Sequence, residues 1–246
     1  MHSLISPFTG ELLGTLVLIL LGNGVVAAVN LKQSKGSGGG WIAITAGWGI
    51  AVFAGVMTAR AWGSPDANLN PAITLSLAIF SGKYSHVPLF LLAQLLGAMG
   101  GAALVWLAYL PHWKVSEDAD IKRQCFCTAP AIRSYGANFL TECIATAVLV
   151  MLAAAMVAHR NIPHGLQDGI GPLLAGYIVW GIGLSLGGPT GYAINPARDL
   201  GPRIAHAVLP VAGKGNSDWG YAWVPVLGPL AGAALAAWFV RAFGVL

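Results

Sequence analysis

Charged residues are scarce in this sequence: Asp, Glu, Lys and Arg together make up 9% of its 246 residues, whereas a soluble domain carries roughly a quarter. The formal net charge is +4, but the basic residues are scattered and do not form a cluster interleaved with aromatics. Nucleic acid is therefore not indicated as a partner. Since 56% of the residues are hydrophobic, the composition favours a membrane protein.

Cysteine is also rare. Cys125, Cys127 and Cys143 show no metal-ligand spacing, and the first two are too close in sequence to pair easily with each other. No Ser/His/Asp, metal-binding or phosphate-cradling arrangement is evident. The sequence therefore indicates no metal site, no cofactor and no enzyme.

Long hydrophobic runs, in contrast, are abundant. A bilayer core needs about 20 apolar residues per helix, and six stretches are of this kind, near residues 12–31, 41–59, 87–110, 139–158, 171–187 and 222–243. No basic segment precedes the first run, so we expect a retained helix rather than a cleaved signal peptide. The sequence predicts an all-α, multi-pass integral membrane protein with one domain over residues 1–246.

The chain also repeats itself. The segment from Glu11 to Thr15 recurs 131 positions later, from Glu142 to Thr146. Residues 95–104 recur at the same offset as residues 226–235, with six of ten positions identical. Each copy, about 5–110 and 136–244, holds three of the apolar runs. Because three is odd, the second copy must cross the membrane in the opposite direction, and such inverted repeats place the functional site near the midplane.

Each copy contains an Asn-Pro-Ala triplet: Asn70-Pro71-Ala72 in the first and Asn195-Pro196-Ala197 in the second. An asparagine N-cap followed by proline is typical of a helix start. Apolar residues continue from the first triplet only to Phe80, which gives about 16 Å of helix at 1.5 Å per residue, or half a bilayer. The second half-helix is expected to end at about Leu209. Such re-entrant segments are tolerated only where they are buried in protein or line a watery cavity, so a pore is predicted.

These paired triplets, the second extended as Gly191-Tyr192-Ala193-Ile194-Asn195-Pro196-Ala197-Arg198-Asp199, resemble the aquaporin superfamily, or major intrinsic proteins. The resemblance is closest to the aquaglyceroporins, or glycerol facilitators, and spans essentially the whole chain. It implies an aquaporin-like fold of six transmembrane helices and two re-entrant half-helices. It also implies a homotetramer in a lipid bilayer, whose pores pass glycerol, water and similar small neutral solutes but exclude ions and protons.

The resemblance also implies roles for individual residues. Asn70 and Asn195 would each offer a side-chain N–H to a passing oxygen, which interrupts a proton-conducting chain of waters. The N-terminal dipole ends of the two half-helices would repel cations at the midplane. Both asparagines would also cap their helices.

Four residues match the family's selectivity filter: Trp48, Gly183, Tyr192 and Arg198. Strict water channels usually have histidine at the position of Gly183, so glycine implies a wider gap. Two aromatic faces opposite one arginine would suit the C–H and O–H edges of a polyol. The best-known glycerol facilitators have phenylalanine at the position of Tyr192, whose hydroxyl could narrow the slot or form a hydrogen bond to solute.

Asp199 and Arg203 also match the glycerol-conducting subgroup, whereas Asn68 stands where the family usually has histidine. Glu11 and Glu142 are acids within apolar runs, which by default indicates function. In the family such glutamates accept hydrogen bonds from the re-entrant loops, and their symmetric placement here favours that structural role.

Five histidines lie near expected helix ends or loops, where a solvated side chain is usual: His86, His112, His159, His164 and His206. The resemblance implies cytoplasmic termini, and the sequence favours a bacterial inner membrane. Lys and Arg are more numerous in segments that would then face outside, which opposes the positive-inside tendency.

Three alternatives stay open. A secondary transporter can also have inverted repeats with broken helices, although Asp66 and Asp199 are the carboxylates near the motifs. A strict water channel and a mainly structural junction protein are the others. The sequence does not rank glycerol, water, urea and lactic acid as solutes.

Overall fold

The computed structural model describes residues 5–167 and 169–245, and all regular secondary structure within them is helical. The helices are α1 (Pro7–Asn30), α2 (Gly40–Ala61), α3 (Pro71–Ser81), α4 (Val87–Ala108), α5 (Leu110–Val115), α6 (Ala119–Gln124), α7 (Tyr135–Val157), α8 (Ile170–Leu186), α9 (Pro196–Val208) and α10 (Val224–Ala242). The predicted all-α fold class is confirmed.

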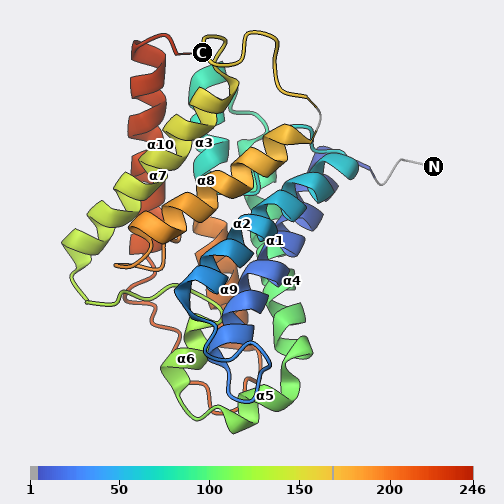
Figure 1. The fold of residues 1–246 in the computed structure, drawn as a ribbon, viewed down its shortest axis with the longest axis vertical. Coiled ribbons are helices and arrows are strands. Elements are labelled where there is room, and N and C mark those ends of the chain that lie inside the picture. Colours follow the sequence, from blue (N-terminus) through green and yellow to red (C-terminus); the bar gives the residue numbers. More distant parts are fainter. Residues whose placement is uncertain (1–4, 168, 246) are drawn as a thin grey trace.

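Six helices correspond to the six expected spans. Five of them, α1, α2, α4, α7 and α10, are long and apolar enough to cross a membrane. The sixth, α8, is an apolar helix of 17 residues, at the lower end of the roughly 17–25 residues that suffice. Figure 1 shows that α1 begins and α10 ends toward the same end of the molecule, opposite α5 and α6, as an even number of crossings requires. The chain is an integral membrane protein.

The two half-helices form as the triplets predict. α3 has 11 residues and α9 has 13, and each begins at the proline of its triplet. The Asn70 side chain accepts a hydrogen bond from the N–H of Ala72 at 2.8 Å, and Asn195 accepts from that of Ala197 at 3.0 Å. The predicted N-caps are confirmed.

The repeat is visible in the packing of small residues. A Cβ at Gly101 of α4 would lie 2.5 Å from the carbonyl oxygen of Leu16 in α1. In the second copy, a Cβ at the equivalent Gly232 of α10 would clash with the carbonyl oxygen of Cys143 in α7. Glycine therefore permits the same close approach of helices in both copies, as expected for helix packing in lipid.

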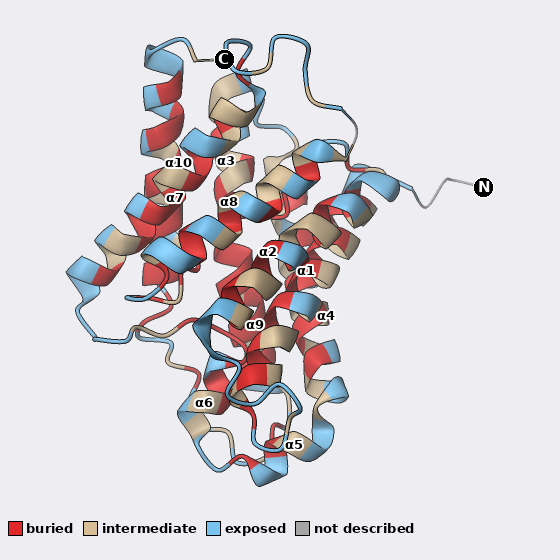
Figure 2. Ribbon diagram, viewed as in Figure 1, coloured by how far each residue is buried: buried red, intermediate tan, exposed pale blue. Residues whose placement is uncertain are grey.

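The burial pattern suits a surrounding of lipid. Figure 2 shows helices with buried faces toward the interior and exposed faces outward. The exposed faces carry large apolar side chains, such as Ile42 at 69% exposure, Leu235 at 61% and Trp238 at 68%. A bilayer would cover such an apolar belt, whereas water would leave it as an aggregation-prone surface.

The structure differs from expectation between residues 108 and 134. The third span ends at Ala108 rather than near 110, and the expected loop contains α5 and α6. Proline in the first turn starts α5, and the side chain of Asp118 caps α6. Trp113 is 1% exposed and packs against Phe126, with ring centroids 5.6 Å apart. Burial of these rings folds the connection onto the bundle.

The prediction of a solvated His206 is wrong. The side chain is fully buried, its Nδ1 lies 2.9 Å from the Oγ of Ser217, and its ring packs against Phe126. His206 lies seven residues after Asp199 on α9 and so on the same face of the helix. That face is covered by the chain segments that follow α6 and α9, which sequence position alone did not reveal.

Candidate pore

Glu11 organises the first re-entrant segment. Its Oε1 accepts hydrogen bonds from the Oγ of Ser64 at 2.7 Å and the N–H of Asn68 at 2.8 Å. Its Oε2 accepts from the N–H of Leu69 and the Nε2 of Gln94, both at 2.8 Å. The glutamate is fully buried, so these donors offset the cost of removing a charge from water.

Glu142 occupies the same place in the second copy. Its two oxygens accept from the N–H groups of Ala193 at 2.9 Å and Ile194 at 2.8 Å, and it too is fully buried. In both copies the glutamate thus binds the two backbone N–H groups that directly precede the asparagine of the triplet.

These hydrogen bonds fix where the backbone carbonyls point. In a trans peptide the C=O points opposite to the N–H of the same plane. Since the N–H groups of Asn68 and Leu69 face Glu11, the carbonyls of Ala67 and Asn68 turn away from it. The same relation turns two consecutive carbonyls away from the glutamate in the second copy. The residues that carry them line a cavity.

The backbone of these segments is unusual in a way that matches this geometry. Alternate residues adopt left-handed conformations: Ala67 (φ 45°), Leu69 (φ 53°), Tyr192 (φ 38°) and Ile194 (φ 43°). Positive φ is uncommon for residues other than glycine, and it costs of the order of 1–3 kcal/mol. Alternation with extended residues is what lets successive carbonyls face one side, and the glutamate contacts hold it in place.

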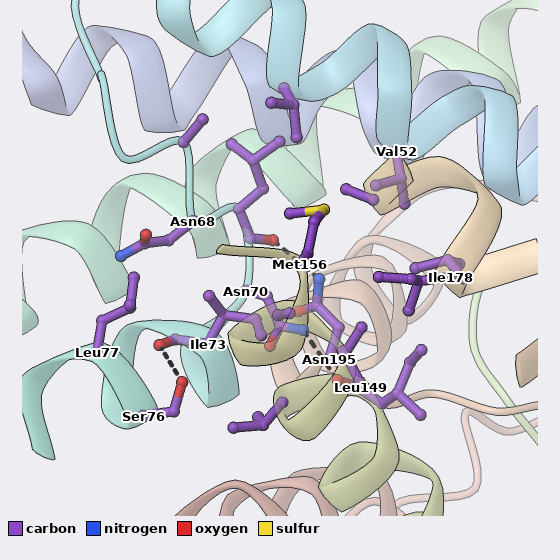
Figure 3. Close-up of a pocket in the computed structure, with 18 of the residues that line it drawn as sticks. Val52, Asn68, Asn70, Ile73, Ser76, Leu77, Leu149, Met156, Ile178 and Asn195 are labelled. Carbon is purple, nitrogen blue, oxygen red and sulfur yellow. Dashed lines mark hydrogen bonds between the residues drawn. The ribbon is translucent and has the colours of Figure 1, made fainter. Parts of the chain in front are cut away.

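The two asparagines connect the copies to each other. Asn70 donates from Nδ2 to the carbonyl of Ile194 at 2.9 Å, and Asn195 donates to the carbonyl of Leu69 at 2.8 Å. Figure 3 shows both side chains together at the cavity wall. A carboxamide has two N–H groups, so each asparagine keeps a second N–H for which the described residues provide no acceptor.

Two cavities are lined by residues of these re-entrant segments. One, of about 300 Å³, runs past both asparagines to Arg60 at the C-terminal end of α2; we call it the inner cavity. The other, of about 210 Å³, includes Trp41 near the start of α2; we call it the outer cavity. The residues that line both are Trp48, Tyr192 and Arg198, so these three side chains separate the cavities.

Arg198 and Trp48 contact each other at this partition. The guanidinium carbon lies 4.2 Å from the centroid of the Trp48 ring, a cation–π contact. Both side chains are buried, at 7% and 3% exposure. No acidic side chain among the described residues forms an ion pair with Arg198. Its guanidinium also donates no hydrogen bond to the described residues, so its N–H groups are available to a ligand at the partition.

Gly183 packs against the Tyr192 ring. It is not among the described residues that line either cavity. A Cβ there would lie 2.7 Å from Cζ of Tyr192 and 2.9 Å from Cγ2 of Thr45. Its carbonyl accepts from the Nε1 of Trp41 at 3.0 Å. The glycine thus makes room for the Tyr192 ring and shapes the partition from behind.

The sequence left open whether the Tyr192 hydroxyl narrows the slot or forms a hydrogen bond to solute. The side chain is 2% exposed, and its hydroxyl oxygen is buried with no hydrogen-bond partner in the described part of the chain. The hydroxyl therefore does not reach solvent in this structure.

Sequence reasoning missed several residues of this arrangement. Gln94 donates to Glu11 and to the Oγ1 of Thr74; a glutamine inside an apolar run was a signal that could have identified it. Trp41 packs edge-on against Tyr192, with centroids 5.8 Å apart. Thr128 lines the outer cavity, and nothing in its sequence context predicts that.

Comparison with known proteins agrees with this architecture. The major intrinsic protein family matches residues 2–240. The chain is 55% identical over 235 residues to a probable glycerol uptake facilitator protein of Thermotoga maritima, covering 94% of this chain and 97% of that one. It is 52% identical over 230 residues to glycerol uptake facilitator protein 3 of Lactiplantibacillus plantarum, covering 93% and 92%. The X-ray structure of the aquaglyceroporin from Plasmodium falciparum matches with a TM-score of 0.83 and 30% identity, covering 97% and 96%. The chain belongs to the major intrinsic protein family.

Proposed function

We propose that this protein is a passive transmembrane channel for glycerol and other small uncharged solutes, together with water. The observation that carries the proposal is the pair of cavities at opposite ends of α2, separated by Trp48, Tyr192 and Arg198. A single narrow partition between two open cavities is the geometry of a selectivity filter. The names of the relatives support glycerol as the solute.

The partition has two chemically different sides. The rings of Trp48 and Tyr192 offer apolar surface to the C–H edge of a polyol, while the unpaired guanidinium of Arg198 donates hydrogen bonds to its hydroxyls. In the inner cavity, the backbone carbonyls that turn away from Glu11 and Glu142 accept hydrogen bonds from the hydroxyls of the solute. The second N–H groups of Asn70 and Asn195 donate hydrogen bonds to the same hydroxyls. A neutral polyol thus exchanges its water for matched partners along the path.

The path does not replace the hydrating water of an ion or a proton in this way. The N-termini of α3 and α9 meet at the asparagines, and each carries about half a positive charge from the helix dipole. Arg198 adds a full positive charge at the partition. Both effects oppose cations, and the fixed N–H donors orient water so that a proton cannot pass along a continuous chain.

Glu11 and Glu142 support this path from behind. Neither reaches solvent, and their hydrogen bonds go to the re-entrant segments. We assign them a structural role: they hold the left-handed backbone that aims the carbonyls at the solute.

The proposal extends to the assembly and its place in the cell. We propose a homotetramer, with one pore per subunit, in a bacterial inner membrane with both termini cytoplasmic. The apolar belt and the bacterial relatives support this placement. Cross-linking in native membranes tests the assembly, and protease access to a tag added at either terminus tests the orientation.

Stopped-flow light scattering on proteoliposomes tests the function. Wild type should admit glycerol and water far faster than protein-free vesicles. In Gly183→Ala, the new Cβ would press the Tyr192 ring toward the partition. If the displaced ring adds about 1.4 kcal/mol to the barrier for glycerol, glycerol permeability should fall about ten-fold, with water less affected. Gly181→Ala is the matched control, since a Cβ at Gly181 on the same helix would meet nothing within 4 Å.

Two results would reject the proposal. Glycerol entry no faster than in empty vesicles would exclude the glycerol channel and leave water or another small solute. Saturable uptake that depends on an ion gradient would indicate a secondary transporter instead.

A further inference from the structure

An ion pair lies directly behind the partition, on the same half-helix as Arg198. Arg203 donates from Nε to Oδ1 of Asp199, one turn earlier on α9, at 2.8 Å. Both side chains are fully buried. Neither residue lines the inner or the outer cavity among the described residues, so the pair does not touch solute.

Every donor of Arg203 is used. Besides its bond from Nε, Nη1 donates to the carbonyls of Ser217 at 2.7 Å and Asp218 at 3.0 Å. Nη2 donates to the carbonyl of Thr128 at 3.0 Å and to Oδ2 of Asp199 at 3.1 Å. A guanidinium has five N–H groups, and all five have acceptors. The arginine thus ties α9 to two separate connecting segments.

Asp199 is equally saturated. In addition to Arg203, its Oδ2 accepts from the N–H of Thr128 at 2.7 Å and from its Oγ1 at 2.6 Å. Thr128 lines the outer cavity together with Arg198. The carboxylate therefore holds the cavity wall, and its oxygens are engaged on the side of α9 that faces the connecting segments.

The engagement of Asp199 by Arg203 affects the neighbouring Arg198. Asp199 is its immediate neighbour in the chain, and an unengaged carboxylate there would be the natural partner of its guanidinium. A buried charge that loses its partner is strongly destabilised and will seek another. In the structure Arg203 meets that need, and Arg198 rests on the Trp48 ring without an ion-pair partner.

We propose that Asp199 and Arg203 are positioning residues of the filter: Arg203 neutralises and holds Asp199, so that the guanidinium of Arg198 stays unpaired and available to solute. This inference rests on the proposed channel function. If it is right, permeation depends on whether an unpaired negative charge stands at position 199, and not simply on whether the ion pair between Asp199 and Arg203 is intact.

Breaking the pair from either side tests this. Arg203→Gln leaves a carboxylate without its partner beside Arg198, whereas Asp199→Asn removes that carboxylate. If Arg198 is captured in Arg203→Gln, the solute loses a hydrogen bond to a charged group, and glycerol permeability per folded channel should fall about ten-fold. The double variant Asp199→Asn/Arg203→Gln removes the carboxylate that would capture Arg198, so it should recover most of the glycerol permeability that Arg203→Gln loses.

A merely structural role predicts a different pattern, in which both single variants lose permeability alike and the double variant is no better. That pattern would overturn the proposal, as would failure to recover the double variant as folded protein by size-exclusion chromatography. Arg133→Gln is the control, because it breaks the partly exposed ion pair with Asp218 between the same connecting segments and should leave permeation unchanged.

Water permeability separates a wrong solute from a wrong positioning role. If wild type passes water but no glycerol, the proposed solute is wrong, and the positioning role is then read from water permeability across the same variants.

Discussion

The two half-helices share one backbone plan and differ in chemistry. Ile73 follows the first triplet at the position that Arg198 holds after the second. Thr74 corresponds in the same way to Asp199, and Ala78 to Arg203. Each copy thus starts its half-helix with the same cap, glutamate and proline, but α3 is apolar and α9 carries three buried charges.

The polar contacts behind the two half-helices differ accordingly. In the first copy, Thr74 donates from Oγ1 to the carbonyl of Asn70 and accepts from Asn68 and Gln94, so the contact network there is neutral apart from Glu11. In the second copy an ion pair takes this place. The repeat therefore supplies the glutamates, caps and half-helices that both copies share, which we call the frame. Selectivity comes from charges that only the second copy contains.

The largest expected effect tests the frame. Glu11→Gln should be more destabilising than Glu142→Gln, because Glu11 accepts from four donors and Glu142 from two backbone N–H groups. Each buried donor left without an acceptor costs about 1–3 kcal/mol. Thermal unfolding in detergent, followed by tryptophan fluorescence, measures the difference. Glu117→Gln, at an exposed glutamate, should leave the melting temperature unchanged, and equal shifts for the two buried glutamates would contradict the ranking.

The next largest effect is expected from removing Arg198, a charge that the first copy lacks. Arg198→Ile gives the second copy the residue of the first. A unit charge acting over about 4 Å contributes several kcal/mol at an effective dielectric of about 20, so proton and potassium leak should rise at least ten-fold. Glycerol should still pass, at a rate about ten-fold lower because it loses its hydrogen bonds to the guanidinium. A pH-sensitive dye inside proteoliposomes measures the leak. Ile73→Val, at the mirror position, should cause none; an unchanged leak in Arg198→Ile would assign ion exclusion to the half-helix dipoles alone.

A smaller effect concerns the connection between the copies, where Cys127 lines the outer cavity. Burial raises the pKa of this thiol to about 12. The thiolate is the reactive form, and its fraction grows with pH up to that pKa. In a Cys125→Ala/Cys143→Ala background, maleimide labelling should therefore be slow at pH 7 and rise roughly ten-fold per pH unit through pH 9. A plateau near pH 8.5, the behaviour of an ordinary thiol, would show that Cys127 is not held in this buried position.

The smallest effect is expected at Tyr192→Phe. Because the hydroxyl oxygen is buried and no described residue pairs with it, its removal should change neither the glycerol nor the water permeability measurably. Stability should be equal or slightly higher, since an unpaired buried polar group is lost. A change in the ratio of the two permeabilities would mean that the hydroxyl reaches the solute.

Much of the frame could be predicted from the sequence, because the signals involved are local or periodic. The apolar runs gave the spans, and the asparagine caps with following prolines gave the starts of α3 and α9 to the residue. The connection that contains α5 and α6 could not be predicted in the same way, since those short helices depend on burial of Trp113 and Phe126 against the bundle. The burial of His206 was mispredicted for the same reason.

For the pore, the sequence by itself determined which residue types stand at the triplets and at the position of Arg198. Only the tertiary structure decided how they act together. It exchanges hydrogen bonds between Asn70 and Ile194 and between Asn195 and Leu69. It also places Gly183 behind the Tyr192 ring and brings Thr128 onto Asp199. These contacts join segments 9 to 126 residues apart. Local propensity and hydrophobic period describe each segment alone, and packing decides which segments meet.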